Sequence, residues 1–135
     1  MATNIFVNLP VRDLPKSMAF FSALGYTFNR QFTDATAACM VIAQDISAML
    51  LTHEKFAEFT PKAICDAKKS TEVLICLSCE SRAEVDAIIG KAVAAGGATY
   101  KPPMDYGFMY GHGFQDLDGH IWEYMWMDPN AVQPA

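Results

Sequence analysis

Residues 116–127, DLDGHIWEYMWM, are the stretch of this sequence that says most about fold and function. Asp118 and Gly119 predict a turn, and the residues after them predict a strand that is almost wholly apolar. One acid, Glu123, stands in the middle of this strand. Because a carboxylate is costly to bury without a partner, we expect Glu123 to act as a general acid or base, or to anchor a polar or cationic ligand.

Working outward, the chain predicts two successive sets of elements, each in the order β-α-β-β-β. In each set the first strand leads to a helix with a recognisable N-cap, Asp13 in the first set and Ser81, in a capping box with Glu84, in the second. Gly25 and the Gly96-Gly97 pair predict where the two helices end. The expected strands are 4–11, 26–33, 36–43 and 46–52 in the first set, and 71–79, 98–102, 107–115 and 120–127 in the second.

The two sets predict an α+β fold made of two tandem modules, at about 4–53 and 71–128, with a linker at about 54–70. The two helix caps differ in number by 68, and the turn that begins at Asp45 corresponds to the one at Asp118, an offset of 73. Each module is too small to bury its sheet alone. We therefore expect about eight strands, curled around a shared central cavity.

Composition excludes several classes of function. The chain has 135 residues, which is the size of one domain, and a net charge of -5 with no stripe of Lys and Arg to neutralise nucleic-acid phosphates. No apolar run reaches the length of about 18 residues that a membrane helix needs. The N-terminal residues lack the pattern of a signal peptide, so a cytoplasmic protein is expected. The four cysteines are then predicted to be reduced thiols.

Two segments give the chain a resemblance to a known family. VNLPVRDLPKSMAFFSALGY (7–26) is similar to the opening strand and helix of the vicinal oxygen chelate superfamily, which includes glyoxalase I, bleomycin and fosfomycin resistance proteins and extradiol dioxygenases. FQDLDGHIWE (114–123) is similar to its closing strand, with Leu117 where proline is usual. Among these proteins the chain most resembles small bacterial proteins described as lactoylglutathione lyase-like.

The resemblance implies a divalent metal held by four ligands, one from the first and one from the last strand of each module. Glu123 stands at one of these positions, where a carboxylate could bind the metal and also act as a base. The other three positions fall on Phe6, Leu50 and Leu74, which carry no donor atom. The resemblance therefore predicts a degenerate metal site, in which these three side chains line a ligand pocket.

Further candidates follow from the alternation of side chains along strands. Asn8 shares the face of Phe6, where it either contacts a ligand or has a structural role, with its side-chain amide hydrogen-bonded to a strand edge. Gly111 and Gly113 are expected to face the cavity, and Tyr110 belongs to an aromatic-rich segment that forms either pocket wall or core. His112 lies between these two glycines, so its side chain is expected to point to the other face of the strand. It is the reserve metal ligand or base, because a bulge in this glycine-rich strand could turn it inward.

Two functions remain open from the sequence. The first is a binding protein that holds a small molecule in an apolar cavity around Glu123, for which the acidic net charge favours a cationic ligand. The second is a metal-dependent lyase or isomerase of the lactoylglutathione lyase type, with Glu123 as metal ligand and base. The resemblance implies a homodimer in either case.

Overall fold

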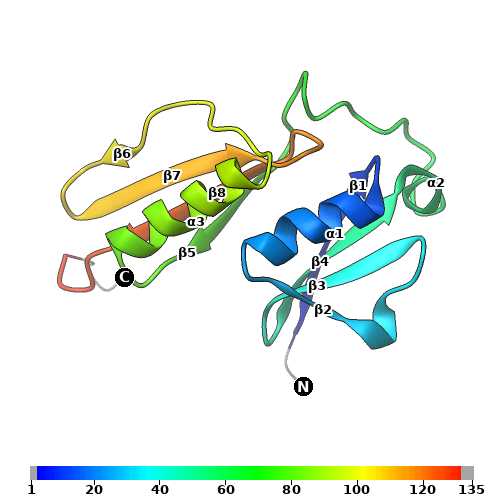
Figure 1. Cartoon of the computed structure of the whole chain (residues 1–135), viewed down its shortest axis with the longest axis horizontal. Helices are drawn as coiled ribbons and strands as arrows, with labels where there is room; N and C mark the ends of the chain where they lie inside the picture. Colours follow the sequence, from blue (N-terminus) through cyan, green and yellow to red (C-terminus); the bar gives the residue numbers. More distant parts are fainter. Residues whose placement is uncertain (1–2, 132–135) are drawn as a thin grey trace. The chain divides into compact units, whose positions relative to one another are not determined.

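The computed structural model describes residues 3–131, which divide into two compact units between Cys65 and Asp66 (Figure 1). The boundary between the units falls inside the segment predicted as a linker. Each unit contains one four-stranded mixed sheet. Within the described part of the chain, no helix is long and apolar enough to span a membrane.

The first unit follows the expected β-α-β-β-β order. Its sheet has the strand order β1-β4-β3-β2, with β1 parallel to β4 and the other neighbours antiparallel. Its elements are β1 (Ile5–Val11), α1 (Leu14–Ala23), β2 (Thr27–Asn29), the 3-10 turn η1 (Arg30–Phe32), β3 (Ala37–Ala43), β4 (Ile46–Thr52) and the short α2 (His53–Phe56).

Helix α1 covers the hydrophobic core of the first unit. The Asp13 side chain accepts a hydrogen bond from the backbone N–H of Lys16 and so caps the helix. The helix buries Phe20 and Phe21 and packs on β3 and β4 (Figure 1). Beneath it lie Leu9 and Leu50, which are direct neighbours on β1 and β4 and are almost fully buried.

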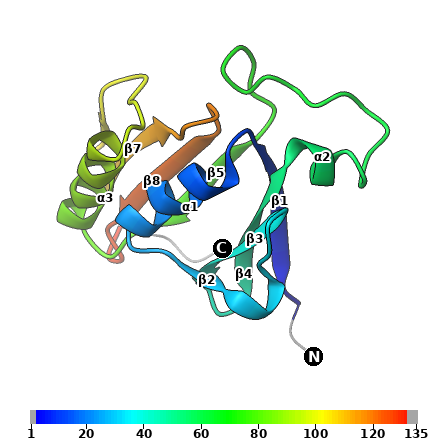
Figure 2. The same ribbon diagram turned by 45° about the vertical axis from the view of Figure 1, so that its right-hand side comes forward.

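The second unit repeats this arrangement. Its sheet has the strand order β5-β8-β7-β6, and β5 is parallel to β8. Helix α3 lies against β7 and β8 and covers one face of the sheet (Figures 1 and 2). Buried Val85, Ile89, Phe114 and Trp122 fill the space between them. The elements are β5 (Leu74–Ser78), α3 (Arg82–Ala94), β6 (Met104–Asp105), β7 (Met109–Gln115) and β8 (Ile121–Met127).

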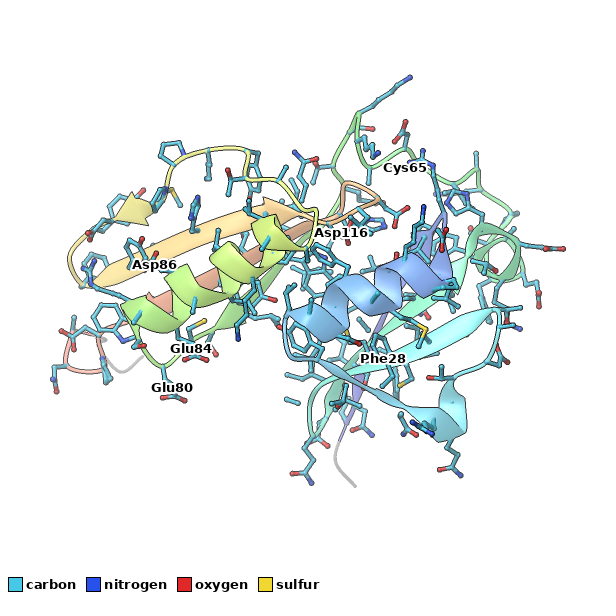
Figure 3. All side chains as sticks on the ribbon, viewed as in Figure 1. Phe28, Cys65, Glu80, Glu84, Asp86 and Asp116 are labelled. Carbon is cyan, nitrogen blue, oxygen red and sulfur yellow. The ribbon has the colours of Figure 1, made fainter. Side chains whose placement is uncertain are left out.

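The turn between β7 and β8 is organised by the buried carboxylate of Asp116 (Figure 3). Its Oδ1 accepts hydrogen bonds from the backbone N–H groups of Asp118 and His120, and its Oδ2 accepts one from the Trp122 indole. Gly119 adopts φ +93°, and a Cβ there would lie 2.7 Å from the backbone nitrogen of Lys68. The turn therefore needs glycine for its conformation and for space.

The α+β class and the tandem order are confirmed, and the expected eight strands form two four-stranded sheets. The strand predicted at 98–102 is wrong. Only an isolated bridge joins Ala98 to Gln115, and pairing resumes at β6 after Pro102 and Pro103, which have no N–H to donate. The strand predicted at 26–33 ends early, because the Asn29 side chain caps η1.

Candidate functional site

The candidate site lies on the face of the second unit's sheet that is turned away from α3, called here the open face. Its central row runs across three strands: Cys76 on β5 lies directly beside Glu123 on β8, which lies directly beside Gly113 on β7. Side chains of such direct neighbours point to the same face, about 5 Å apart at their Cβ atoms. The sheet therefore presents a thiol, a carboxylate and a gap side by side.

Glu123 is the central group of this row. It is half-buried, and no hydrogen bond or ion pair to its carboxylate exists among residues 3–131. Its charge raises the pKa values of two neighbours, Cys76 and Tyr100, which locates both within its electrostatic reach. The carboxylate is thus held on the sheet with its hydrogen-bonding capacity unused.

Tyr100 fills the gap over Gly113. Its ring carbon Cζ lies 3.2 Å from the position that a Cβ of Gly113 would take, and its hydroxyl oxygen lies closer still. This oxygen is fully buried and has no hydrogen-bond partner. Burial, followed by the charges of Glu123 and Cys76, raises the pKa of the phenol. At neutral pH the hydroxyl therefore keeps its proton and can donate it in a hydrogen bond.

Cys76 completes the row on the other side of Glu123. Its thiol is free. Partial burial, followed by the charge of Glu123, raises its pKa, so the thiol stays protonated at neutral pH. Cys76 is consequently a weak hydrogen-bond donor here rather than a nucleophilic thiolate.

Thioethers make up much of the open face around this row. Met125 pairs with Gly111, whose missing side chain leaves space beside the Met125 Cβ, 3.7 Å from where a Cβ of Gly111 would be. Methionine side chains are flexible and polarisable, and they make favourable contacts with aromatic rings. The methionines on this face are Met104, Met109, Met125 and Met127.

Three of the predicted pocket residues of the second unit share the open face with Glu123. Leu74 begins β5 in the same alternation as Cys76 and is 54% exposed, and Gly111 and Gly113 flank β8. Gly113 opens no free space, however, because Tyr100 occupies it.

Tyr110 lies on the opposite face, so of the two roles expected for its segment, pocket wall or core, the pocket-wall role is wrong for Tyr110. Its hydroxyl donates to Asp86 on α3 at 2.6 Å (Figure 3), and its ring stacks under Arg82. His112 also lies on the α3 side, with Nε2 2.9 Å from the carbonyl oxygen of Lys101. No bulge turns it towards Glu123, so the structure keeps the reserve ligand away from the site.

In the first unit, Phe6 and Asn8 lie on the sheet face that α1 leaves uncovered, and both are exposed. The placement of Leu50 on this face was wrong, because Leu50 pairs with Leu9 under α1. Met49, the direct neighbour of Asn8, is the counterpart of Glu123. Asn8 and Cys76 each lie five residues before a helix N-cap, and their neighbours are Met49 and Glu123.

Sequence reasoning missed two residues of this site, Tyr100 and Cys76. Tyr100 lies in an irregular segment where the sequence predicts a strand, and for Cys76 the sequence predicts only a reduced thiol. The alternation Leu74, Cys76, Ser78 along a strand parallel to β8 could have placed Cys76 beside Glu123. No sequence signal places Tyr100 over Gly113, because that contact joins a loop to a strand.

The donor set does not fit a divalent metal ion. Among the residues that the structure describes, no three His, Cys, Asp or Glu side chains lie close enough to hold one. Glu123 has one protonated thiol and one protonated phenol as its polar neighbours. A divalent ion needs several deprotonated or carbonyl-type ligands that converge on one point.

Comparisons with known proteins agree with this fold. The family model for the bleomycin resistance protein-like N-terminal region matches residues 3–43. A hypothetical protein from S. aureus is 30% identical, with a TM-score of 0.78 over 93% of this chain and 94% of that one. No curated protein matches.

Two further solved structures share the fold at lower identity. A glyoxalase/bleomycin resistance protein/dioxygenase family enzyme from Burkholderia phytofirmans is 17% identical, with a TM-score of 0.76 over 93% of this chain and 99% of that one. A fosfomycin resistance protein from Listeria monocytogenes is 18% identical, with a TM-score of 0.69 over 96% and 97%. The chain belongs to the glyoxalase/bleomycin resistance protein/dioxygenase family, the vicinal oxygen chelate superfamily.

Proposed function

We propose that this protein binds a small organic molecule on the open face of its second unit, with Glu123 as the polar anchor and without a chelated metal. The observation that carries the proposal is the Glu123 carboxylate, which has no partner among residues 3–131 and is surrounded by thioethers and Leu74. A carboxylate in such surroundings gains from a ligand that supplies a positive charge or a hydrogen-bond donor.

The chemistry of the face supports a ligand that is partly aromatic. Met125 and its neighbouring methionines offer adaptable contacts to rings, and the glycine at 111 leaves room beside them. The net charge of -5 favours cations over anions at long range. Similarity to the bleomycin and fosfomycin resistance families supports a role in binding or inactivating small molecules.

Binding of metal-free bleomycin, a cationic and partly aromatic probe, tests the proposal by isothermal titration calorimetry. Glu123→Gln keeps the shape of the side chain and removes its charge, so we expect affinity to fall by about tenfold or more, since charge-assisted hydrogen bonds are the strong ones. Glu72→Gln is the matched control, because Glu72 is exposed ahead of β5. Equal affinity of the wild type and Glu123→Gln would contradict the proposal.

The second candidate is a metal-dependent lyase of the lactoylglutathione lyase type, in which Glu123 is both metal ligand and base. It is supported by the position of Glu123 on the last strand of the second module. Elemental analysis after loading with Ni, Zn, Mn and Fe separates the two. About one metal per chain, lost in Glu123→Ala, would favour the lyase, whereas a chain that retains no metal would favour the binding protein.

A further inference from the structure

The Tyr100 hydroxyl is the one buried side-chain polar atom in residues 3–131 that lacks a hydrogen-bond partner. An unpaired buried hydroxyl destabilises a folded protein, so its presence needs a reason. A tyrosine kept only for packing could be phenylalanine, which fills the same space without the penalty. The oxygen therefore points to a partner that the chain itself does not supply.

The sheet holds this hydroxyl in a fixed place. Gly113 has no side chain, and a Cβ there would approach Cζ of Tyr100 to 3.2 Å and the carbonyl oxygen of Trp122 to 3.0 Å. The end of the phenol thus occupies the space over Gly113, which a side chain at position 113 would fill. Gly113 is in turn the direct neighbour of Glu123.

A hydrogen-bond donor and a hydrogen-bond acceptor therefore lie near each other on the open face, because Tyr100 lies over Gly113, the direct neighbour of Glu123. The phenol is a donor, and the carboxylate of Glu123 is an acceptor without a partner. Because this oxygen is fully buried, a ligand can reach it only when a side chain that covers it moves. A ligand that satisfies both groups must carry an acceptor and a donor on neighbouring atoms.

We propose that Tyr100 contacts the ligand, and that Tyr100 and Glu123 together select a carboxamide-type group. Its C=O would accept from the Tyr100 hydroxyl and its N–H would donate to Glu123, while the apolar part of the ligand would lie on Leu74 and Met125. This inference rests on the proposed function and adds the chemical class of the ligand to it.

Two probes of the same shape separate the roles of the two residues. Benzamide has an N–H donor beside a C=O acceptor, whereas benzamidine has only donors and a positive charge. Binding of each is followed by NMR, from the shifts of the backbone amides of β7 and β8. In Tyr100→Phe we expect benzamide to bind about five- to tenfold more weakly, which lies within the range of about two- to twelvefold for one lost neutral hydrogen bond, and benzamidine to change by less than about twofold.

A matched variant and a stability measurement serve as controls for this comparison. Tyr106→Phe makes the same chemical change at a tyrosine that is 58% exposed, and we expect it to leave both probes unaffected. Tyr100→Phe should unfold at a temperature equal to or above that of the wild type, because it removes an unpaired buried oxygen. A lower unfolding temperature would mean that the hydroxyl has a structural partner, and it would overturn the proposal.

The outcomes also distinguish this proposal from the proposed function. If benzamide does not bind the wild type, or if Tyr100→Phe weakens both probes equally or neither, Tyr100 does not select a carboxamide. In those cases Glu123→Gln can still weaken bleomycin and benzamidine, and the proposed function stands. If Glu123→Gln weakens neither, the proposed function itself fails.

Discussion

At the scale of single residues, the Tyr100 phenol on the open face occupies the space that a side chain at Gly113 would need. Gly113→Ala would push its new methyl group into the Tyr100 phenol and towards the carbonyl oxygen of Trp122. Because neither the backbone nor a packed ring can yield easily, we expect a loss of about 1–3 kcal/mol in the free energy of unfolding. Urea denaturation followed by circular dichroism measures this loss.

Gly111→Ala is the matched control for this substitution. A Cβ at 111 would meet its nearest neighbours, the carbonyl oxygen of Tyr124 and the Cβ of Met125, at 3.5 and 3.7 Å, which are ordinary contacts. The change there should be under about 0.5 kcal/mol. In the double variant Gly113→Ala/Tyr100→Phe, part of the loss should be recovered, because the closest atom is removed. Strict additivity of the two changes would contradict the contact.

Asp116 gives a second prediction, because it uses both of its carboxylate oxygens as acceptors. Asn has one oxygen, so in Asp116→Asn its amide NH2 must face either the Trp122 indole N–H or the two backbone N–H groups. We expect the free energy of unfolding to fall by about 2 kcal/mol, the cost of leaving buried donors unpaired. Denaturant unfolding at neutral pH measures it.

The control for Asp116 is Asp128→Asn. Asp128 is a turn residue whose Oδ1 accepts a hydrogen bond from the backbone N–H of Asn130. An amide oxygen can replace that acceptor, so the change should be under about 0.5 kcal/mol. Equal losses in the two variants would show that the charge, and not the double acceptor, is what the turn requires.

The part of the site that can be predicted from the sequence is the part that follows from the alternation of side chains along a strand. Glu123 was recognised because a lone acid in an apolar strand is unusual, and the assignment of Gly111 and Gly113 to its face follows from a period of two. The placement of Leu50 failed because it was counted from Asp45, in a turn shorter than the one at Asp118. Met49 is the true counterpart of Glu123, and only the strand pairing reveals it.

At the scale of elements, Arg82 joins α3 to the hairpin formed by β6 and β7. Its guanidinium donates to both carboxylate oxygens of Asp105, at 2.8 and 2.9 Å, and to the carbonyl oxygen of Gly107. It also lies 5.1 Å from the ring centre of Tyr110 and 5.3 Å from that of Trp126. This geometry requires the planar fork of arginine, and lysine cannot reproduce it.

The hydrogen bonds from Arg82 and from the backbone of Gly107 lower the pKa of Asp105 to about 2. In Arg82→Lys we expect this pKa to rise towards the ordinary value, as measured by NMR titration of the Asp105 carboxyl group. Arg30→Lys is the matched control, since Arg30 is exposed in the other unit. An Asp105 pKa that is unchanged in Arg82→Lys would contradict the role of the fork.

The lowered pKa of Asp105 also determines how the stabilisation by the Arg82–Asp105 pair changes with pH. Because Asp105 has a lower pKa in the folded chain than in the unfolded chain, the pair stabilises the fold above the unfolded pKa, about 4. This contribution is lost as the pH falls through about 2. The stability difference between the wild type and Arg82→Lys should therefore be largest near neutral pH and shrink in acid.

The elements themselves were predicted where a local signal sets their ends. Asp13 and Ser81 cap the two helices as the sequence indicates, because a cap acts through the next three residues. Glu84 completes the second cap by accepting from the backbone N–H of Glu80. The strand predicted at 98–102 does not form, because the segment ends in Pro102 and Pro103 follows it, and neither proline has an N–H to donate to a neighbouring strand.

At the scale of the whole molecule, the chain repeats one design, a four-stranded sheet with a single helix over one face. The repeat and the family were predictable because each module carries its own caps and turns. The arrangement also leaves apolar side chains exposed on both sheets. In the first unit these include Ile5 and its direct neighbour Ile46, at 54% and 37% exposed, together with Phe6 at 54%.

Exposed apolar groups of this kind are typical of surfaces that bind another protein, which leads to the prediction that the chain forms a homodimer. Phe6→Asp places a charge on the sheet face that α1 leaves uncovered, opposite to the face of Ile5 and Ile46. We expect it to shift the protein to monomers in sedimentation velocity, with an unchanged circular dichroism spectrum. Phe59→Asp is the control, because Phe59 is 68% exposed and lies outside the strands. A monomeric wild type would refute the dimer, and equal dissociation by both variants would assign the effect to added charge rather than to the face that carries Phe6.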